Sequence, residues 1–154
     1  MSKQWNFEIL SWLFIIVFSV LIVGPIYIKA GNSFNFYYHN ILSVVIFLGL
    51  TRYIFLLKYT PISRIKWVKM LFVFLPIPFV LFQIDSLYEF QRFIDEEGTI
   101  SLFKGSTDID DYQFGKYIRL EFVFFCVASL VSLFALPVRM IISFWRTTNT
   151  KDLV

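Results

Sequence analysis

Three charged residues, Asp85, Arg119 and Glu121, flank two of the long apolar segments of the chain. Carboxylate and guanidinium groups form strong charge-assisted hydrogen bonds, so such groups at a membrane boundary suit the binding of a lipid head group or another polar ligand. We interpret these three residues as candidates for lipid or ligand binding near one face of a membrane. The alternative is structural: an ion pair between Asp85 and Arg119 that ties two helix ends together.

A second group of acidic residues, Asp108, Asp110 and Asp111, has the spacing D-x-D-D. Clustered oxygens suit Ca²⁺ or Mg²⁺, but this spacing lacks the glycine and the distal glutamate of a recognised calcium loop. Acidic residues are also favoured in the first turn of a helix, and Thr107 is a suitable N-cap. We favour the helix start and predict no metal.

Few other residues offer chemistry. The single cysteine, Cys126, excludes an internal disulfide, and the single histidine, His39, excludes a haem held by two histidines. We expect His39 to join a belt of interfacial aromatic residues and Cys126 to serve in packing. The apolar segments contain no pair of serine and histidine, and the chain has no H-E-x-x-H motif or glycine-rich phosphate loop. We therefore predict no cofactor, and the inventory argues against an enzyme.

Composition decides the class of protein. Of the 154 residues, 58% are hydrophobic and 16% are charged, whereas a soluble domain is about half apolar and about a quarter charged. A net charge of +3 is too small to indicate nucleic-acid binding. The sequence predicts an integral membrane protein.

Four apolar segments are candidates to cross a bilayer, which needs about 20 residues of helix. We predict spans at residues 9–28, 38–57, 67–84 and 122–145, within a single membrane domain covering 1–154. The predicted fold is an all-α four-helix transmembrane bundle. The third span contains two prolines and reaches full length only if Lys69 extends to the head groups. The first is longer than the core of an ordinary signal peptide, so we expect it to be retained.

Charge sorting predicts the orientation. Between Arg52 and Lys69 there are five basic residues and no acid, whereas residues 85–121 contain nine acidic and four basic residues. Because cytoplasmic loops collect lysine and arginine, we expect residues 85–121 outside and both termini in the cytoplasm. A bacterial inner (plasma) membrane is the expected location.

The long outer loop, residues 85–121, contains a helix signal. Ser86 and Glu89 fit a capping box, and Leu87, Phe90 and Ile94 follow at helical spacing. We predict a short amphipathic helix from Leu87 to Glu97 that turns these apolar side chains away from water. A fourth helix that begins near residue 108 is also expected.

The fourth span contains a stripe of small and polar residues on one helical face. Its members are Glu121, Ala128, Ser132, Ala135, Arg139, Ser143 and Arg146. Small residues allow close helix contact, so Ala128, Ser132, Ala135 and Arg139 are candidates for a helix interface. We favour packing inside the bundle; the alternative is contact with a helix of another protein.

These observations lead to two functional hypotheses. The first is a non-catalytic accessory or structural subunit that packs against a larger membrane assembly. The second is a membrane-embedded enzyme or binding protein for a lipid or quinone-like molecule. The expected partners are the lipid bilayer and either a membrane protein or a second copy of the chain, without nucleic acid.

Overall fold

The computed structural model describes residues 3–31, 34–98, 101 and 109–149, and this part of the chain is helical without strands. Its elements are α1 (Lys3–Ala30), α2 (Tyr37–Leu56), the 3₁₀ helices η2 (Leu57–Tyr59) and η3 (Pro61–Arg64), α3 (Lys66–Phe74), α4 (Pro76–Glu97) and α5 (Ile109–Asn149). Four helical segments are long and apolar enough to cross a membrane: α1, α2 with η2, α3 with α4, and α5. The all-helical class and the four candidate spans are confirmed.

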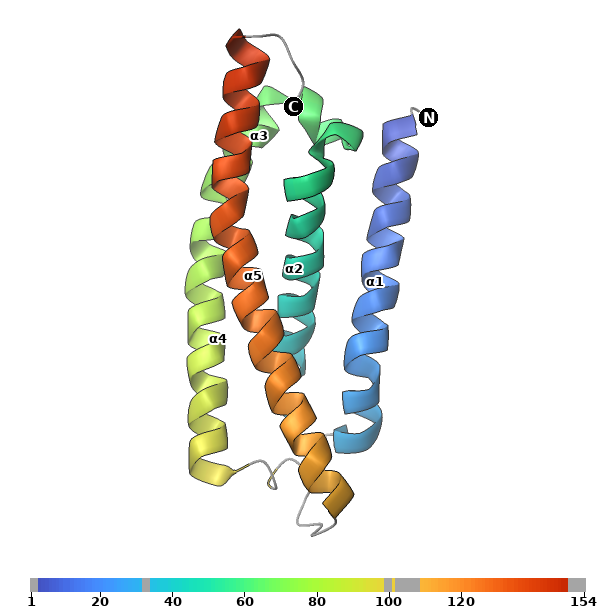
Figure 1. The fold of residues 1–154 in the computed structure, drawn as a ribbon, viewed down its shortest axis with the longest axis vertical. Coiled ribbons are helices and arrows are strands. Elements are labelled where there is room, and N and C mark those ends of the chain that lie inside the picture. Colours follow the sequence, from blue (N-terminus) through green and yellow to red (C-terminus); the bar gives the residue numbers. More distant parts are fainter. Residues whose placement is uncertain (1–2, 32–33, 99–100, 102–108, 150–154) are drawn as a thin grey trace.

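The helices form an open layer in the order α1, α2, α5, α4 (Figure 1). The two inner segments, α2 and α5, are the most buried: 39% of the most apolar part of each is buried. The corresponding fraction is 22% for α1 and 17% for α3 with α4. The helix α1 packs on α2 and η3, and no extensive contact joins α1 to α4 in the described residues. We call the end that holds the start of α1, the η2–η3 turn and the last residues of α5 the terminal end (Figure 1).

Two prolines divide the third segment into α3 and α4. Pro76 occupies the first turn of α4, where its missing N–H interrupts the hydrogen-bond ladder least. Lys69 does not extend away from the bundle as expected. Its side chain is fully buried, and Nζ donates a hydrogen bond to Thr147 Oγ1 of α5 at 2.8 Å.

The expected outer loop is largely helical. Residues 87–97 form the last part of α4 instead of a separate helix, and Ser86 does not cap them, because its Oγ donates to the carbonyl oxygen of Phe82 within the same helix. Phe90 and Ile94 are buried, in the direction that the pattern predicted. Gly98, with φ +76°, ends α4. The expected cap Thr107 and Asp108 lie outside the described residues.

An aromatic cluster explains why α4 and α5 extend beyond the predicted spans. Phe90 of α4 stacks on Phe122 of α5 with ring centroids 4.0 Å apart. Phe34, in the connection after α1, meets both rings edge-on, and Phe36 packs beside them. These four residues, called the aromatic cluster below, join α1, α4 and α5 at the end opposite the terminal end.

Candidate functional site

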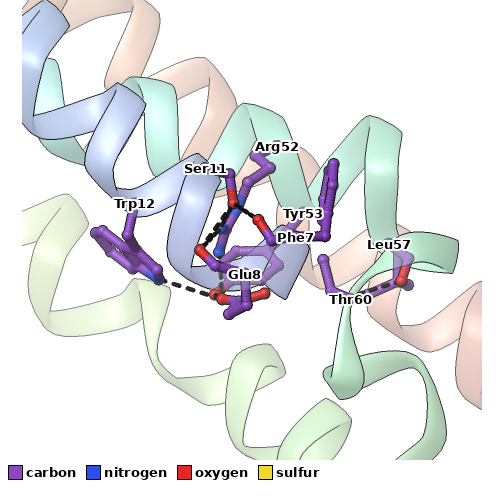
Figure 2. Close-up of polar contacts among 8 residues, drawn as sticks. All are labelled: Phe7, Glu8, Ser11, Trp12, Arg52, Tyr53, Leu57 and Thr60. Carbon is purple, nitrogen blue, oxygen red and sulfur yellow. Dashed lines mark hydrogen bonds and ion pairs between the residues drawn. The ribbon is translucent and has the colours of Figure 1, made fainter. Parts of the chain in front are cut away.

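A buried ion pair links α1 to α2 at the terminal end. Glu8 Oε1 lies 2.6 Å from Arg52 Nη2 and also accepts hydrogen bonds from Tyr53 Oη at 2.7 Å and Trp12 Nε1 at 3.2 Å (Figure 2). Arg52 also donates to Ser11 Oγ, and its guanidinium lies 4.3 Å from the Tyr53 ring centroid. We call these five residues the Glu8–Arg52 cluster.

The Glu8–Arg52 cluster has the properties of a structural contact. The side chains of Arg52 and Glu8 are only 5% and 12% exposed, and each charge faces its opposite. Glu8 directly precedes the predicted first span and Arg52 lies within the predicted second span, but a pairing across 44 positions has no local signal in the sequence. Glu8 Oε2 is the one carboxylate atom of this pair without a hydrogen bond.

A second polar cluster joins α2, α4 and α5 inside the layer. Asn40 Nδ2 donates a hydrogen bond to Glu121 Oε2 at 2.8 Å. Ser43 Oγ lies 3.0 Å from Gln83 Oε1 and 3.3 Å from Cys126 Sγ. We call these five residues the Glu121 cluster. Its members are all buried, and Glu121 is 7% exposed, so this carboxylate faces the interior of the layer instead of its surface.

The structure does not bring the three predicted ligand-binding residues together. Asp85 and Arg119 are both exposed, and no ion pair joins them in the described part of the chain. Arg119 instead borders a groove of about 450 Å³ between α4 and α5. The groove is lined by Phe90, Gln91, Ile94, Lys116, Arg119, Leu120 and Val123.

The predicted stripe on α5 faces α2 at two points. Ser132 is buried with its Oγ 3.4 Å from Thr51 Oγ1, and Arg139 Nε donates to the carbonyl oxygen of Ile54 at 3.0 Å. Ala128 and Ala135 are half-buried. These contacts favour the interpretation of packing within the layer.

The buried face of α5 is wider than the predicted stripe. It also contains Cys126, Ser129, Leu133, Leu136 and Met140. Leu133 and Leu136 lie outside the predicted stripe and are nevertheless buried, because α5 contacts α3 and α4 as well as α2. The burial and Ser43 contact of Cys126 agree with the expected packing role.

The remaining candidates have structural contacts. Asp111 lies in the first turn of α5, 3.3 Å from Lys29 Nζ at the end of α1. His39 belongs to α2 and stacks on Phe82 with an interplanar angle of 5°. Among the described residues, no group of three histidine, cysteine, aspartate or glutamate side chains has an arrangement that could hold a metal ion.

Neither a protein-family model, a curated protein nor a solved structure matches the chain. The fold and the two polar clusters define its class: an all-helical protein with four candidate membrane-spanning helices and polar side chains joined across helix interfaces.

Proposed function

We propose that this chain is a non-catalytic integral membrane protein that acts as an accessory or structural subunit of a larger membrane assembly. In this proposal both termini are cytoplasmic in a bacterial inner membrane. The start of α1, the basic η2–η3 turn and the end of α5 share one end of the layer, which supports the same side for both termini (Figure 1).

The open edge of the layer at α1 carries this proposal. A shallow groove of about 730 Å³ runs along this helix from Trp5 to Val17. Its lining includes Trp5, Glu8, Ile9, Trp12, Leu13, Ile16 and Val17. Since α1 is covered mainly by α2, this surface is free to pack against a helix from another protein.

The chemistry of the groove suits a protein helix better than lipid chains. Tryptophan is enriched among the residues that dominate protein interfaces, and two tryptophans line this groove. Glu8 also lines it, so a polar side chain lies among the apolar ones. A partner helix can place a polar side chain beside Glu8, whereas hydrocarbon chains cannot.

Site-specific cross-linking tests the proposal. A photoreactive amino acid at Leu13, in native membranes, is expected to give one discrete protein adduct whose mass identifies the partner. The matched control is Val131 on α5, because Leu13 and Val131 are apolar and 58% and 63% exposed. An adduct of twice the chain mass would indicate a homo-oligomer. Lipid adducts alone at both positions would contradict the proposal.

The groove between α4 and α5 favours a second candidate function, the binding of an anionic lipid. Lys116 and Arg119 are exposed, lie one turn apart on α5 and border an apolar floor that includes Phe90 and Leu120. Two cations above an apolar groove match a phosphate group with its acyl chain. Each basic residue near a membrane surface contributes about 1 kcal/mol of attraction to anionic lipid.

This second candidate predicts a selective loss of lipid. In nanodiscs with equal phosphatidylglycerol and phosphatidylcholine, native mass spectrometry is expected to show phosphatidylglycerol retained by the unmodified chain. The double substitution Lys116→Gln and Arg119→Gln should lower that preference at least roughly tenfold. The control Arg92→Gln removes a cation from α4 outside the groove and should keep the preference. Equal retention of both lipids by the unmodified chain would exclude this function.

A further inference from the structure

The carboxylate of Glu121 lacks a compensating charge. Its one hydrogen-bond partner is the neutral amide of Asn40, and no ion pair joins Glu121 to lysine or arginine within the described residues. Glu8, the other buried carboxylate of the described chain, has Arg52 at 2.6 Å. An ionised carboxylate away from water is strongly destabilising unless a positive charge accompanies it or a proton neutralises it.

The hydrogen bonds of Ser43 reveal a further unpaired oxygen. Ser43 Oγ carries one proton, yet it lies 2.7 Å from the carbonyl oxygen of His39 and 3.0 Å from Gln83 Oε1. Only one of these acceptors can receive the proton. If Ser43 donates its proton to the nearer acceptor, the carbonyl oxygen of His39, then Gln83 cannot accept a hydrogen bond from Ser43. Rotating the Gln83 amide by half a turn exchanges its nitrogen and oxygen, so that Nε2 donates to Ser43 Oγ. The rotation therefore gives Gln83 Nε2 a partner, which it otherwise lacks.

With the Gln83 amide rotated, α2, α4 and α5 each contribute one buried side-chain oxygen that receives no hydrogen bond. Asn40 Oδ1 on α2 and Glu121 Oε1 on α5 are buried and have no hydrogen-bond partner. After the half-turn, Gln83 Oε1 on α4 becomes the third. Such unpaired atoms are unusual, because buried polar groups nearly always have a partner. All three are hard oxygens, and together they carry one negative charge.

We propose that the Glu121 cluster binds one monovalent metal cation, coordinated by side-chain oxygens of Asn40, Gln83 and Glu121. Oxygen ligands of this type suit hard cations. A single positive charge neutralises the one carboxylate, whereas a divalent ion would leave a buried net charge of the opposite sign. A water molecule supplies hydrogen-bond donors but leaves the carboxylate charge uncompensated.

The surroundings of the cluster suit an enclosed cation. Phe122 follows Glu121 in the chain and stacks on Phe90 in the aromatic cluster. Phe90 and Phe122 are fully buried, so packed apolar side chains adjoin the Glu121 cluster. The Glu121 cluster lies on the side of α2 that contacts α5, whereas the proposed partner surface on α1 lies on the other side of α2.

Thermal unfolding of the purified full chain in detergent tests the site. The probes are NaCl, KCl, CaCl₂ and choline chloride at matched ionic strength, because choline is too large for a site among packed side chains. We expect Na⁺ or K⁺ to raise the Tm by roughly 5–10 °C at about a hundred times its Kd, relative to choline. Direct binding of radioactive Na⁺ or of Rb⁺, as a K⁺ analogue, should saturate near one ion per chain.

Two substitutions locate the effect. Glu121→Gln keeps the side-chain shape and should abolish the difference between the monovalent metal ions and choline. Glu96→Gln removes an exposed carboxylate from α4 and should keep the difference. Asn40→Asp adds a second negative charge to the cluster and should make Ca²⁺ more stabilising than Na⁺.

The measurement on the unmodified chain decides the proposal even if the variants fail to fold. Equal Tm values in all four salts at neutral and alkaline pH, without ion binding, would overturn it and leave Glu121 as a neutral carboxylic acid. Stabilisation of the unmodified chain by Ca²⁺ alone would also overturn it. A monovalent effect that persists in Glu121→Gln would place the cation elsewhere and refute this site.

Discussion

Replacing Arg52 by alanine is expected to lower the free energy of unfolding by about 3–5 kcal/mol, because it leaves the Glu8 carboxylate buried without its cation. Arg52 Nη2 lies 2.6 Å from Glu8 Oε1, and the two side chains are 5% and 12% exposed. The substitution also removes the hydrogen bond to Ser11 and the contact with the Tyr53 ring. Since α1 packs mainly on α2, the loss should release α1 first. Equilibrium unfolding in mixed micelles measures the change.

The matched control is Arg92→Ala. Arg92 also faces a glutamate, Glu96, but the atoms are 3.8 Å apart and the side chains are 61% and 67% exposed. An exposed pair of this kind contributes about 0–1 kcal/mol. The double substitution Glu8→Gln with Arg52→Ala should destabilise less than the sum of the two single changes, because it leaves no unpaired charge. Equal losses for Arg52→Ala and Arg92→Ala would show that the buried pair does not hold α1.

The helices could be predicted from the sequence because each depends on a local pattern. Uninterrupted apolar runs indicate helices long enough to cross a bilayer, and they gave the number of candidate spans correctly. The ends were less predictable. Ser86 and Glu89 have the spacing of a capping box, but α4 continues through Ser86 without a break. The contact of Phe90 with Phe122 stabilises this continuous helix. Tertiary packing overrides a cap that is worth about 1 kcal/mol.

The polar clusters could not be predicted because their bonds join distant positions. Asn40 and Glu121 are 81 residues apart, and Glu8 and Arg52 are 44 apart. Periodicity states which residues share a helical face but does not identify the helix that this face meets. For this reason the sequence places Glu121 on the packed face of the fourth span but does not identify Asn40 or Gln83 as members of its cluster.

The periodicity of the stripe on α5 likewise does not tell whether this face meets a helix of the same chain or of a partner. A pair of substitutions distinguishes internal packing from partner binding. Ser132 is 5% exposed and its Oγ lies 3.4 Å from Thr51 Oγ1, so a leucine at this position must push α2 and α5 apart. Overpacking of a dense interior destabilises by about 1–3 kcal/mol. We expect Ser132→Leu to lower the free energy of unfolding by that amount, measured in the same micelles.

Phe134→Leu is the matched substitution, because Phe134 lies two positions away on α5 and is 64% exposed. It should change stability by less than about 0.5 kcal/mol, as surface substitutions usually do. Because the groove on α1 is formed without α5, chains that still fold with Ser132→Leu should retain the cross-link from Leu13. Loss of that adduct with unchanged stability would instead assign the stripe to a partner helix. Two harmless substitutions would show that Ser132 tolerates a large side chain, and the close contact between α2 and α5 would then be refuted.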